Sequence, residues 1–317
     1  MAYTEQEARE LVIEAGHRLL ENHLVARTWG NISARISDKQ FIITPSGRAY
    51  DTLQPEDLVK VNIRDGSYEG EYKPSSEKGI HAAAYRLRPD VDFVIHTHQF
   101  YASAVCAEGI DSLFAPCAGY GLPGTGKLKR AVVQVIRDNQ QSKAFLMARH
   151  GALCLGESFE DAFAVAEKLE RQCKMLFEQR VPVSKPLDGD FAVEKMKGVP
   201  FARWENDPFT AEWSRRDMPL HAYIDDFAQI VGHTAPVCRA KPRAAAKALR
   251  RHNAVILRDC GAVCTADAAD DAQAVSMILQ KNCAAALYAG NTRPLPLGDA
   301  LLQRTVYLKK YAKQKDS

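Results

Sequence analysis

The sequence predicts an α/β protein whose second half partly repeats its first. Strand-like and helix-like segments alternate between residues 91 and 180, a pattern typical of a sheet covered by helices on both faces. Residues 144–178 align with residues 254–288 at a constant offset of 110, and ten of the 35 aligned positions are identical. With 317 residues and a hydrophobic content of 46%, the chain can bury a large core and form two domains.

The first segments are an amphipathic helix and two short strands. Residues 4–7 form a capping-box pattern, and five apolar residues follow at helical spacing: Ala8, Leu11, Val12, Ala15 and Leu19. Strands are expected at residues 32–36 and 41–44, and residues 45–47 would close the second strand with a turn. Loops rich in Gly, Asn and Ser can bind an oxyanion such as phosphate through backbone N–H groups, although simple turn formation explains the same residues.

A third strand and a second helix come next. Residues 58–63 read as the strand, and Ser75, Ser76 and Glu77 begin the helix. A serine N-cap leaves helix N–H groups facing outward, which suits an anion, but a plain N-cap is the commoner meaning of this motif. His81 follows Glu77 by four residues on the same helix face, so it could orient Glu77 or simply pack, and we do not expect it to be a metal ligand.

Three histidines lie at the ends of buried strands. An apolar run ends in His96 and His98, and the two-residue period of a strand places both imidazoles on one face. Another apolar run ends at His150, just before Gly151. Because a catalytic zinc-type site takes three protein ligands and keeps one position open, these residues predict a metal centre, with ordinary core histidines as the alternative.

The rest of the first half reads as a loop at residues 119–125 and helices at 127–137 and 157–179. Residues 182–210 contain four prolines and predict a linker with one short helix.

The second half keeps the pattern of the first without its candidate chemistry. At the offset of 110, Cys260 is the counterpart of His150, and Asn206 and Pro208 are the counterparts of His96 and His98. Cys260 and Cys264 could bind zinc with a nearby histidine, but core packing explains them more simply. A run of basic residues between 239 and 251 lacks interleaved aromatics and is typical of a solvated helix face.

Composition restricts the classes of function. The formal charge of +3 is too small to indicate a nucleic-acid partner, and no apolar run is long enough to cross a membrane. The first 25 residues contain no apolar segment typical of a signal peptide, so we expect a cytoplasmic protein. The eight cysteines are scattered through apolar stretches, which favours reduced thiols over a disulfide framework.

Six motifs, in order, resemble one known family. They lie within about residues 5 to 180, and they are Gly30 to Arg35, Ile43 to Gly47, Ser75 to Glu77 with His81, His96 to His98, Tyr120 to Thr125, and Arg149 to Gly151. In these motifs the chain resembles the class II (adducin-like) aldolases, typified by L-fuculose-1-phosphate aldolase.

The resemblance implies a fold, a domain division and a set of site residues. The fold would be the α/β/α sandwich of the class II (AraD-like) aldolases with a mostly antiparallel central sheet. Residues 1–181 would form the metal-dependent aldolase domain, 182–210 the linker, and 211–317 a degenerate partial repeat without catalytic residues. A divalent metal, Zn²⁺ first and Mn²⁺ or Co²⁺ as alternatives, would be bound by three histidines, and Glu77 would be the catalytic acid/base and a ligand of the metal without substrate. The metal ligands would be His96, His98, His150 and Glu77. The phosphate-binding residues would be Thr28, Asn31, Ser46, Gly47, Ser75 and Ser76.

The activity implied is reversible retro-aldol cleavage of a ketose 1-phosphate to dihydroxyacetone phosphate and an aldehyde. Family members assemble as homo-tetramers, so we expect a homo-oligomer and a phosphorylated sugar substrate. A sugar-phosphate epimerase or a decarboxylase on the same metal site remains open, as does a non-catalytic adducin-like interaction domain. Residues 124–127 lack the histidine that the epimerases carry there, which favours the aldolase.

Overall fold

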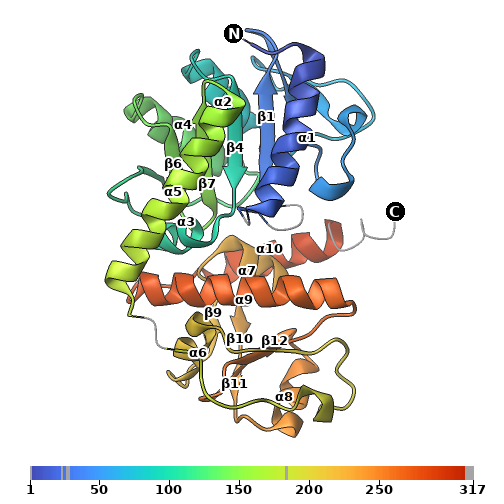
Figure 1. The fold of residues 1–317 in the computed structure, drawn as a ribbon, viewed down its shortest axis with the longest axis vertical. Helices are drawn as coiled ribbons and strands as arrows, with labels where there is room; N and C mark the ends of the chain where they lie inside the picture. Colours follow the sequence, from blue (N-terminus) through green and yellow to red (C-terminus); the bar gives the residue numbers. More distant parts are fainter. Residues whose placement is uncertain (1, 23, 26–28, 183–184, 311–317) are drawn as a thin grey trace. The chain divides into compact units, whose positions relative to one another are not determined.

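The computed structural model describes residues 2–22, 24–25, 29–182 and 185–310, and the chain divides into two compact units (Figure 1). Unit 1 is Met1–Lys174 and unit 2 is Met175–Ser317. None of the helices among the described residues is long and apolar enough to span a membrane.

Unit 1 contains one sheet of seven strands, in the order β3-β2-β1-β4-β7-β6-β5. All neighbouring strands are antiparallel except β5 and β6, which confirms the predicted α/β fold with a mostly antiparallel sheet. The strands are β1 (Asn31–Arg35), β2 (Gln40–Ile43), β3 (Val59–Asn62), β4 (Phe93–Thr97), β5 (Cys117–Ala118), β6 (Ala144–Met147) and β7 (Gly151–Gly156). The helices are α1 (Glu5–Glu21), α2 (Lys78–Leu87), α3 (Phe100–Val105), α4 (Gly126–Asp138) and α5 (Phe159–Arg180), with 3-10 turns η1 (Tyr50–Thr52), η2 (Pro55–Asp57) and η3 (Cys106–Glu108).

The main core of unit 1 lies between this sheet and helices α2 and α4. Val94 and Phe145 of the sheet are buried with Ile80 of α2 and Val132 of α4. Helix α1, whose capping box at Thr4 and Glu7 forms as predicted, packs on β1 and β2. The sheet therefore holds the ends of β1, β4 and β7 side by side, since β4 pairs with both of the others.

The start of α2 differs from the prediction of a serine N-cap. Glu77 occupies the N-cap position, and the Ser75 hydroxyl accepts a hydrogen bond from the Glu77 backbone N–H at 3.2 Å. Ser75 is itself tied to the strand end, because its N–H donates to the Thr44 carbonyl. The serines thus form a turn before the helix, and this turn leaves the Glu77 side chain free to reach the sheet.

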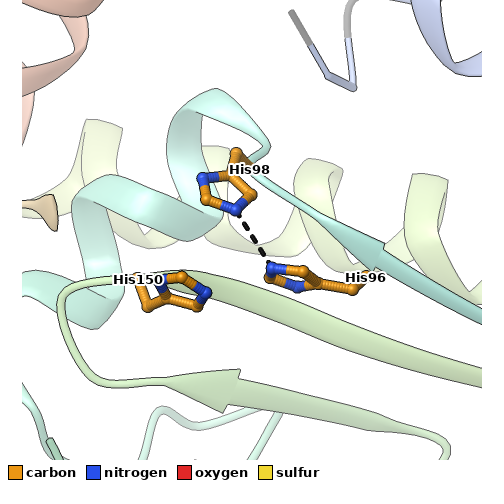
Figure 2. Close-up of side chains that lie close together, drawn as sticks. All are labelled: His96, His98 and His150. Carbon is orange, nitrogen blue, oxygen red and sulfur yellow. Dashed lines mark hydrogen bonds between the residues drawn. The ribbon is translucent and has the colours of Figure 1, made fainter. Parts of the chain in front are cut away.

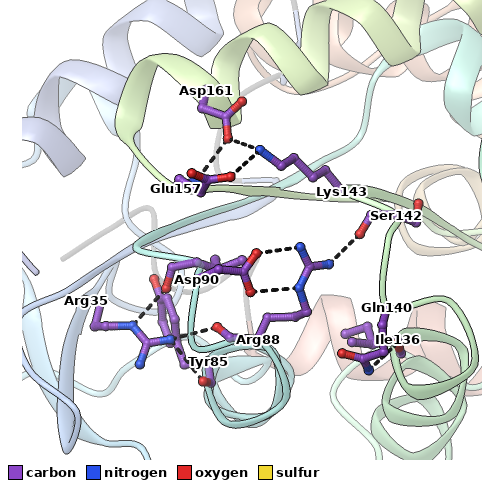
Figure 3. Close-up of polar contacts among 11 residues, drawn as sticks. Arg35, Tyr85, Arg88, Asp90, Ile136, Gln140, Ser142, Lys143, Glu157 and Asp161 are labelled. Carbon is purple, nitrogen blue, oxygen red and sulfur yellow. Dashed lines mark hydrogen bonds and ion pairs between the residues drawn. The ribbon is translucent and has the colours of Figure 1, made fainter. Parts of the chain in front are cut away.

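Charged contacts fix the far end of α2 (Figure 3). Arg88 forms two hydrogen bonds with Asp90, at 2.9 and 2.7 Å, and donates a third to the Ser142 carbonyl. Arg35 of β1 donates to the backbone carbonyls of Tyr85 and Arg88. Because one Arg35 nitrogen donates to two backbone carbonyls at the end of α2, this end of the helix is held against β1.

Unit 2 repeats part of the same architecture. Its main sheet has the order β11-β12-β13-β8, which corresponds to β5-β6-β7-β4 of unit 1, and only β11 and β12 are parallel, as β5 and β6 are. The strands are β8 (Arg203–Glu205), β9 (Leu220–His221), β10 (Thr234–Ala235), β11 (Val237–Cys238), β12 (Ala254–Leu257) and β13 (Ala262–Cys264). The helices are α6 (Pro208–Ser214), α7 (Asp225–Ile230), α8 (Pro242–Leu249), α9 (Ala269–Ala289) and α10 (Leu297–Lys310), with a 3-10 turn η4 (Val193–Lys195).

The strand register corrects the predicted counterparts of two histidines. His96 pairs with Leu153 on β7, and the equivalent of Leu153, Val263 on β13, pairs with Trp204. Trp204 and Asn206 therefore stand where His96 and His98 stand in unit 1, and the predicted pair, Asn206 and Pro208, is wrong by two residues. The offset of 110 holds for β12 through α9 but becomes 108 at β8, because the connection between β8 and β13 is two residues longer than that between β4 and β7.

The segment predicted as a linker, residues 182–210, belongs to unit 2 where the structure describes it. Phe191 and Met196 are buried in the core formed by α8 and β12, and β8 is an edge strand of the sheet. Residues outside helices and strands supply this part of the core. The prediction of a linker rested on the proline-rich composition alone and did not anticipate these buried side chains.

Candidate metal centre

The three predicted histidines meet at one end of the sheet of unit 1 (Figure 2). His96 lies on β4 and His98 directly follows the last residue of that strand, while His150 lies in the turn between β6 and β7. Arg149 in this turn has a positive φ of 64°. A Cβ atom at Gly151 would lie 2.3 Å from the carbonyl oxygen of Thr97, so only glycine allows β7 to approach β4 closely enough to bring His150 to the other two.

The geometry of the three rings suits a metal ion. One nitrogen from each ring lies within 4.8 Å of the others, and all three side chains are buried. The Nε2 atoms of His96 and His98 are 3.0 Å apart. His96 Nδ1 lies 2.8 Å from the Ala152 carbonyl, to which it donates, so the lone pair of its Nε2 faces the other histidines.

The electrostatics favour a neutral His96 imidazole that can act as a ligand. Burial lowers the pKa of His96 to about 3, against the opposing effect of Glu77. The ring is therefore uncharged at neutral pH and can donate its lone pair to a cation. Three imidazole nitrogens converging in a buried space form a donor set typical of zinc-type sites.

The Glu77 carboxylate contacts two of the histidines. Its Oε1 is 3.1 Å from His150 Nε2, its Oε2 is 3.3 Å from His96 Nε2, and the side chain is only 7% exposed. Burial opposes ionisation, but hydrogen bonds from His150 and Asn31 hold the pKa of Glu77 well below its ordinary value. An ionised carboxylate thus lies at the edge of the histidine cluster.

The structure brings five of the six predicted phosphate residues to the same region of unit 1. Asn31 begins β1 directly opposite His96 in the sheet register. An isolated bridge between Pro45 and Pro74 places the turn of Ser46 and Gly47 beside the Ser75 turn, and the Ser46 N–H donates to the Lys73 carbonyl. The sixth residue, Thr28, lies outside the described residues.

A pocket lies beside Glu77, between the first turns of α2 and α4. Its volume is about 320 Å³, including the part open to solvent. It is lined by Ser76, Glu77, Gly79, Ile80, Gly124, Thr125, Gly126, Leu128 and Lys129. A small molecule in this pocket would lie beside both Glu77 and Lys129.

Two connections were missed by sequence reasoning. The Asn31 side chain donates to Glu77 Oε2 at 3.0 Å, and His81 contacts Asn31 rather than Glu77. The spacing of Asn31 and Ser33 on a strand, and of Glu77, His81 and Tyr85 on a helix, could have indicated two polar faces that pack together.

At the equivalent strand ends of unit 2, a tryptophan and a cysteine replace His96 and His150. The Trp204 indole N–H donates to the Cys260 carbonyl at 2.7 Å, and no metal-like group of three side chains occurs among the described residues of this unit.

Comparisons with known proteins agree on the first part of the chain. The model of the Class II Aldolase and Adducin N-terminal domain matches residues 10–177. A 5-deoxy-D-ribulose 1-phosphate aldolase of Bacillus thuringiensis is 33% identical over 193 residues, which cover 57% of this chain and 89% of that protein. A 3-oxo-tetronate 4-phosphate decarboxylase of Escherichia coli K12 is 30% identical over 192 residues, covering 56% and 89%. The crystal structure of YgbL from Klebsiella pneumoniae, described as an aldolase, epimerase or decarboxylase, superimposes with a TM-score of 0.51 at 26% identity, over 56% of this chain and 91% of that one.

Proposed function

The chain belongs to the class II aldolase and adducin family, and on this basis we propose that unit 1 is a metal-dependent class II aldolase. The family and its fold, both expected from the sequence, are confirmed. The proposed reaction is reversible retro-aldol cleavage of a ketose 1-phosphate to dihydroxyacetone phosphate and an aldehyde. The observation that carries the proposal is the buried Glu77 carboxylate, within 3.3 Å of nitrogens of two histidines in a cluster of three.

The metal would be held by His96, His98 and His150, with Zn²⁺ preferred and Mn²⁺ or Co²⁺ as alternatives. When bound, it would supply the Lewis acid that stabilises negative charge next to a carbonyl. The hydrogen bond from His96 Nδ1 to the Ala152 carbonyl supports this role, because it fixes the tautomer that leaves Nε2 unprotonated.

Glu77 would move the proton at the carbon from which the aldehyde departs. A general base must be ionised, close to the substrate and shielded from bulk water. The hydrogen bonds that favour the ionised form of Glu77, its burial and its place among the residues that line the pocket support these three conditions. Because Glu77 also touches two of the histidines, we include it among the ligands of the metal before substrate binds.

The phosphate would bind at the strand and helix ends beside Glu77. Asn31, Ser46, Gly47, Ser75 and Ser76 are the proposed contacts, with Thr28 as a sixth. Small hydroxyls and backbone N–H groups at the start of a helix suit a phosphate dianion. Fixing the phosphate would hold the reacting carbons over the histidines. Assembly into a homo-tetramer is part of the same proposal.

Decarboxylation is the second candidate, and one observation favours it. The Lys129 side chain lines the pocket beside Glu77, and an ammonium there suits a substrate carboxylate. A relative that is 30% identical is a decarboxylase of a phosphorylated 3-oxo acid. An interaction domain without catalysis is less well supported, because all three histidines and Glu77 lie together and buried.

The test is a product assay on two substrate panels with enzyme of measured metal content. Wild type and Glu77→Gln are incubated with ketose 1-phosphates, assayed for dihydroxyacetone phosphate, and with phosphorylated 3-oxo acids, assayed for carbon dioxide. Dihydroxyacetone phosphate from the wild type, reduced at least about 100-fold in Glu77→Gln, is the expected result. Carbon dioxide instead would establish the decarboxylase, and neither product from a fully metal-loaded protein would contradict both reactions.

A further inference from the structure

We propose that His81, Ser33 and Tyr85 are positioning residues, which hold the Asn31 amide, and through it the Glu77 carboxylate, in one orientation. This inference rests on the proposed function, because it concerns the residue assigned there as the acid/base. It adds a buried chain of side chains that do not touch the pocket.

The chain of hydrogen bonds is continuous from Glu77 to Tyr85. Asn31 Nδ2 lies 3.0 Å from Glu77 Oε2, and Asn31 Oδ1 lies 2.5 Å from His81 Nε2. Ser33 Oγ then lies 2.6 Å from His81 Nδ1 and 2.7 Å from the Tyr85 hydroxyl. His81 and Ser33 are completely buried, and Tyr85 is 1% exposed, so water does not compete for these contacts.

The chemistry of the groups gives this chain a direction. The Asn31 NH₂ group donates to Glu77 Oε2, so its side-chain carbonyl oxygen faces His81. His81 must then donate from Nε2, which leaves Nδ1 to accept from the Ser33 hydroxyl. Tyr85 completes the chain by donating to the Ser33 oxygen. Burial, which lowers the pKa of His81 to about 4, keeps the ring in the neutral form that this arrangement needs.

The arrangement follows from two secondary-structure periods. Asn31 and Ser33 are two residues apart on β1, and Glu77, His81 and Tyr85 are spaced by four at the start of and along α2. One face of the strand therefore meets one face of the helix with polar groups. The far end is rigid, because the Arg35 guanidinium lies 4.8 Å over the Tyr85 ring and donates to the Tyr85 carbonyl (Figure 3).

The consequence of the chain concerns how firmly the Asn31 amide is held. The Asn31 NH₂ group faces a Glu77 oxygen, and the His81 N–H anchors the other end of the amide. Without a donor at His81, the side-chain carbonyl oxygen of Asn31 would be left buried without a hydrogen bond, and the amide would shift to find another partner. The hydrogen bond from Asn31 to Glu77 would then weaken, and the carboxylate would lose its fixed orientation.

The variants that test this are His81→Leu, which removes the donor, and His81→Gln, which restores an N–H donor in place of Nε2. Tyr85→Phe removes only the last hydroxyl, and Tyr50→Phe is its matched control. The Tyr50 hydroxyl is also buried in unit 1, but without a hydrogen-bond partner among the described residues.

We expect kcat per bound metal to fall about 10- to 100-fold in His81→Leu, as for other partners that orient a site residue, and less in Tyr85→Phe. His81→Gln should recover most of the loss, and Tyr50→Phe should not change kcat. Metal content should stay at that of the wild type in all four. A drop in metal content or thermal stability with unchanged kcat per metal would show a merely structural role and overturn the proposal.

Two further measurements separate this inference from the proposed function. In a Glu77→Gln background, His81→Leu should have no additional effect, and an undiminished effect there would contradict the inference alone. Full turnover of Glu77→Gln itself would contradict the proposed role of Glu77.

Independently of activity, the NMR signal of the Asn31 side-chain NH₂, identified by its loss in Asn31→Ala, should show slow hydrogen exchange in the metal-free wild type and His81→Gln. It should exchange at least about 10-fold faster in His81→Leu, and equal rates would overturn the proposal.

Discussion

The two units use the same four-strand arrangement, but only the first gathers histidines at its end. In both, a turn with a positive φ precedes a glycine, through Arg149 in unit 1 and Asp259 in unit 2. A Cβ at Gly151 would lie 2.3 Å from the Thr97 carbonyl oxygen, and one at Gly261 would lie 2.1 Å from that of Glu205. The close approach of the strand ends is therefore common to both units, because packing of the sheet requires it.

The side chains at these strand ends differ completely. Where unit 1 has His96 and His150, unit 2 has Trp204 and Cys260, joined by a hydrogen bond from the indole to the Cys260 carbonyl. Asn206, in place of His98, makes two hydrogen bonds to the backbone of Leu187. Since the fold forms without histidines in unit 2, folding alone does not require them in unit 1. Unit 2 thus serves as an internal control for every substitution at the candidate site.

The strongest test of this comparison is the pair His150→Ala and Cys260→Ala. We expect His150→Ala to lose most of the bound metal and at least about 1000-fold in activity, since it removes a ligand outright. Cys260→Ala should retain both, because alanine keeps the backbone carbonyl that accepts the Trp204 hydrogen bond. The measurement is the metal content per chain after dialysis. Equal metal content in the two variants would contradict the assignment of the metal site to unit 1 alone.

Lowering the pH should destabilise unit 1 more than unit 2 in the metal-free protein. Burial lowers the pKa of His81 to about 4 and that of His96 to about 3, whereas an unfolded histidine titrates near 6.5. Between pH 6.5 and about 4 the unfolded chain binds protons that the folded unit does not, so stability falls as pH falls and is fully present above pH 6.5. For His81 alone the loss is on the order of 3 kcal/mol.

Unit 2 should lose much less over the same range. Its three histidines, His221, His233 and His252, are all at least partly exposed. Hydrogen exchange in increasing urea at pH 7 and pH 4.5 measures the stability of β4 and β12 separately. Parallel losses in both strands would show that the buried histidines do not control acid stability.

The fold and the histidine cluster could be predicted from the sequence, because both depend on patterns within short segments. The two-residue period of a strand placed His96 and His98 together, and ordered motifs identified the fold. The N-cap at Glu77 could not be predicted, because serine and glutamate both begin helices and the backbone angles decide between them. The chain from Glu77 to Tyr85 depends on β1 packing against α2, a contact between segments distant in sequence that no local pattern specifies.

The counterparts of His96 and His98 in unit 2 were misplaced for a related reason. Identities between β12 and α9 fixed an offset that does not extend to β8, because the loops between these elements differ in length. Only the pairing of Trp204 with Val263 reveals the shift. The roles of the proposed phosphate residues also stay predictions, since proximity of Ser46 and Ser75 is a property of the turn as well as of a binding site.

A smaller effect is expected from introducing a Cβ at the two glycines. Gly151→Ala and Gly261→Ala both force a methyl group against a carbonyl oxygen, and each should destabilise its own unit by about 1–3 kcal/mol. Only Gly151→Ala should also reduce metal affinity, because it displaces the turn that carries His150. Thermal unfolding with metal titration distinguishes them, and weakened metal binding in Gly261→Ala would contradict the independence of the two sites.

The smallest effect should come from Trp204→Phe. This variant tests the hydrogen bond from Trp204 to Cys260, the two residues that stand in unit 2 where His96 and His150 stand in unit 1. Phenylalanine keeps most of the ring but removes the indole N–H, so the Cys260 carbonyl loses its donor at a cost of about 1 kcal/mol. Hydrogen exchange at β8 and β13 should become about 5-fold faster, while β4 and β7 should not change. The matching experiment in unit 1 is metal removal, which should accelerate exchange at β4 and β7 but not at β8 and β13. If both changes occur, a bound ion joins the strand ends of unit 1 where a tryptophan joins those of unit 2; if metal removal leaves β4 and β7 unchanged, the histidines do not bridge these strands through an ion.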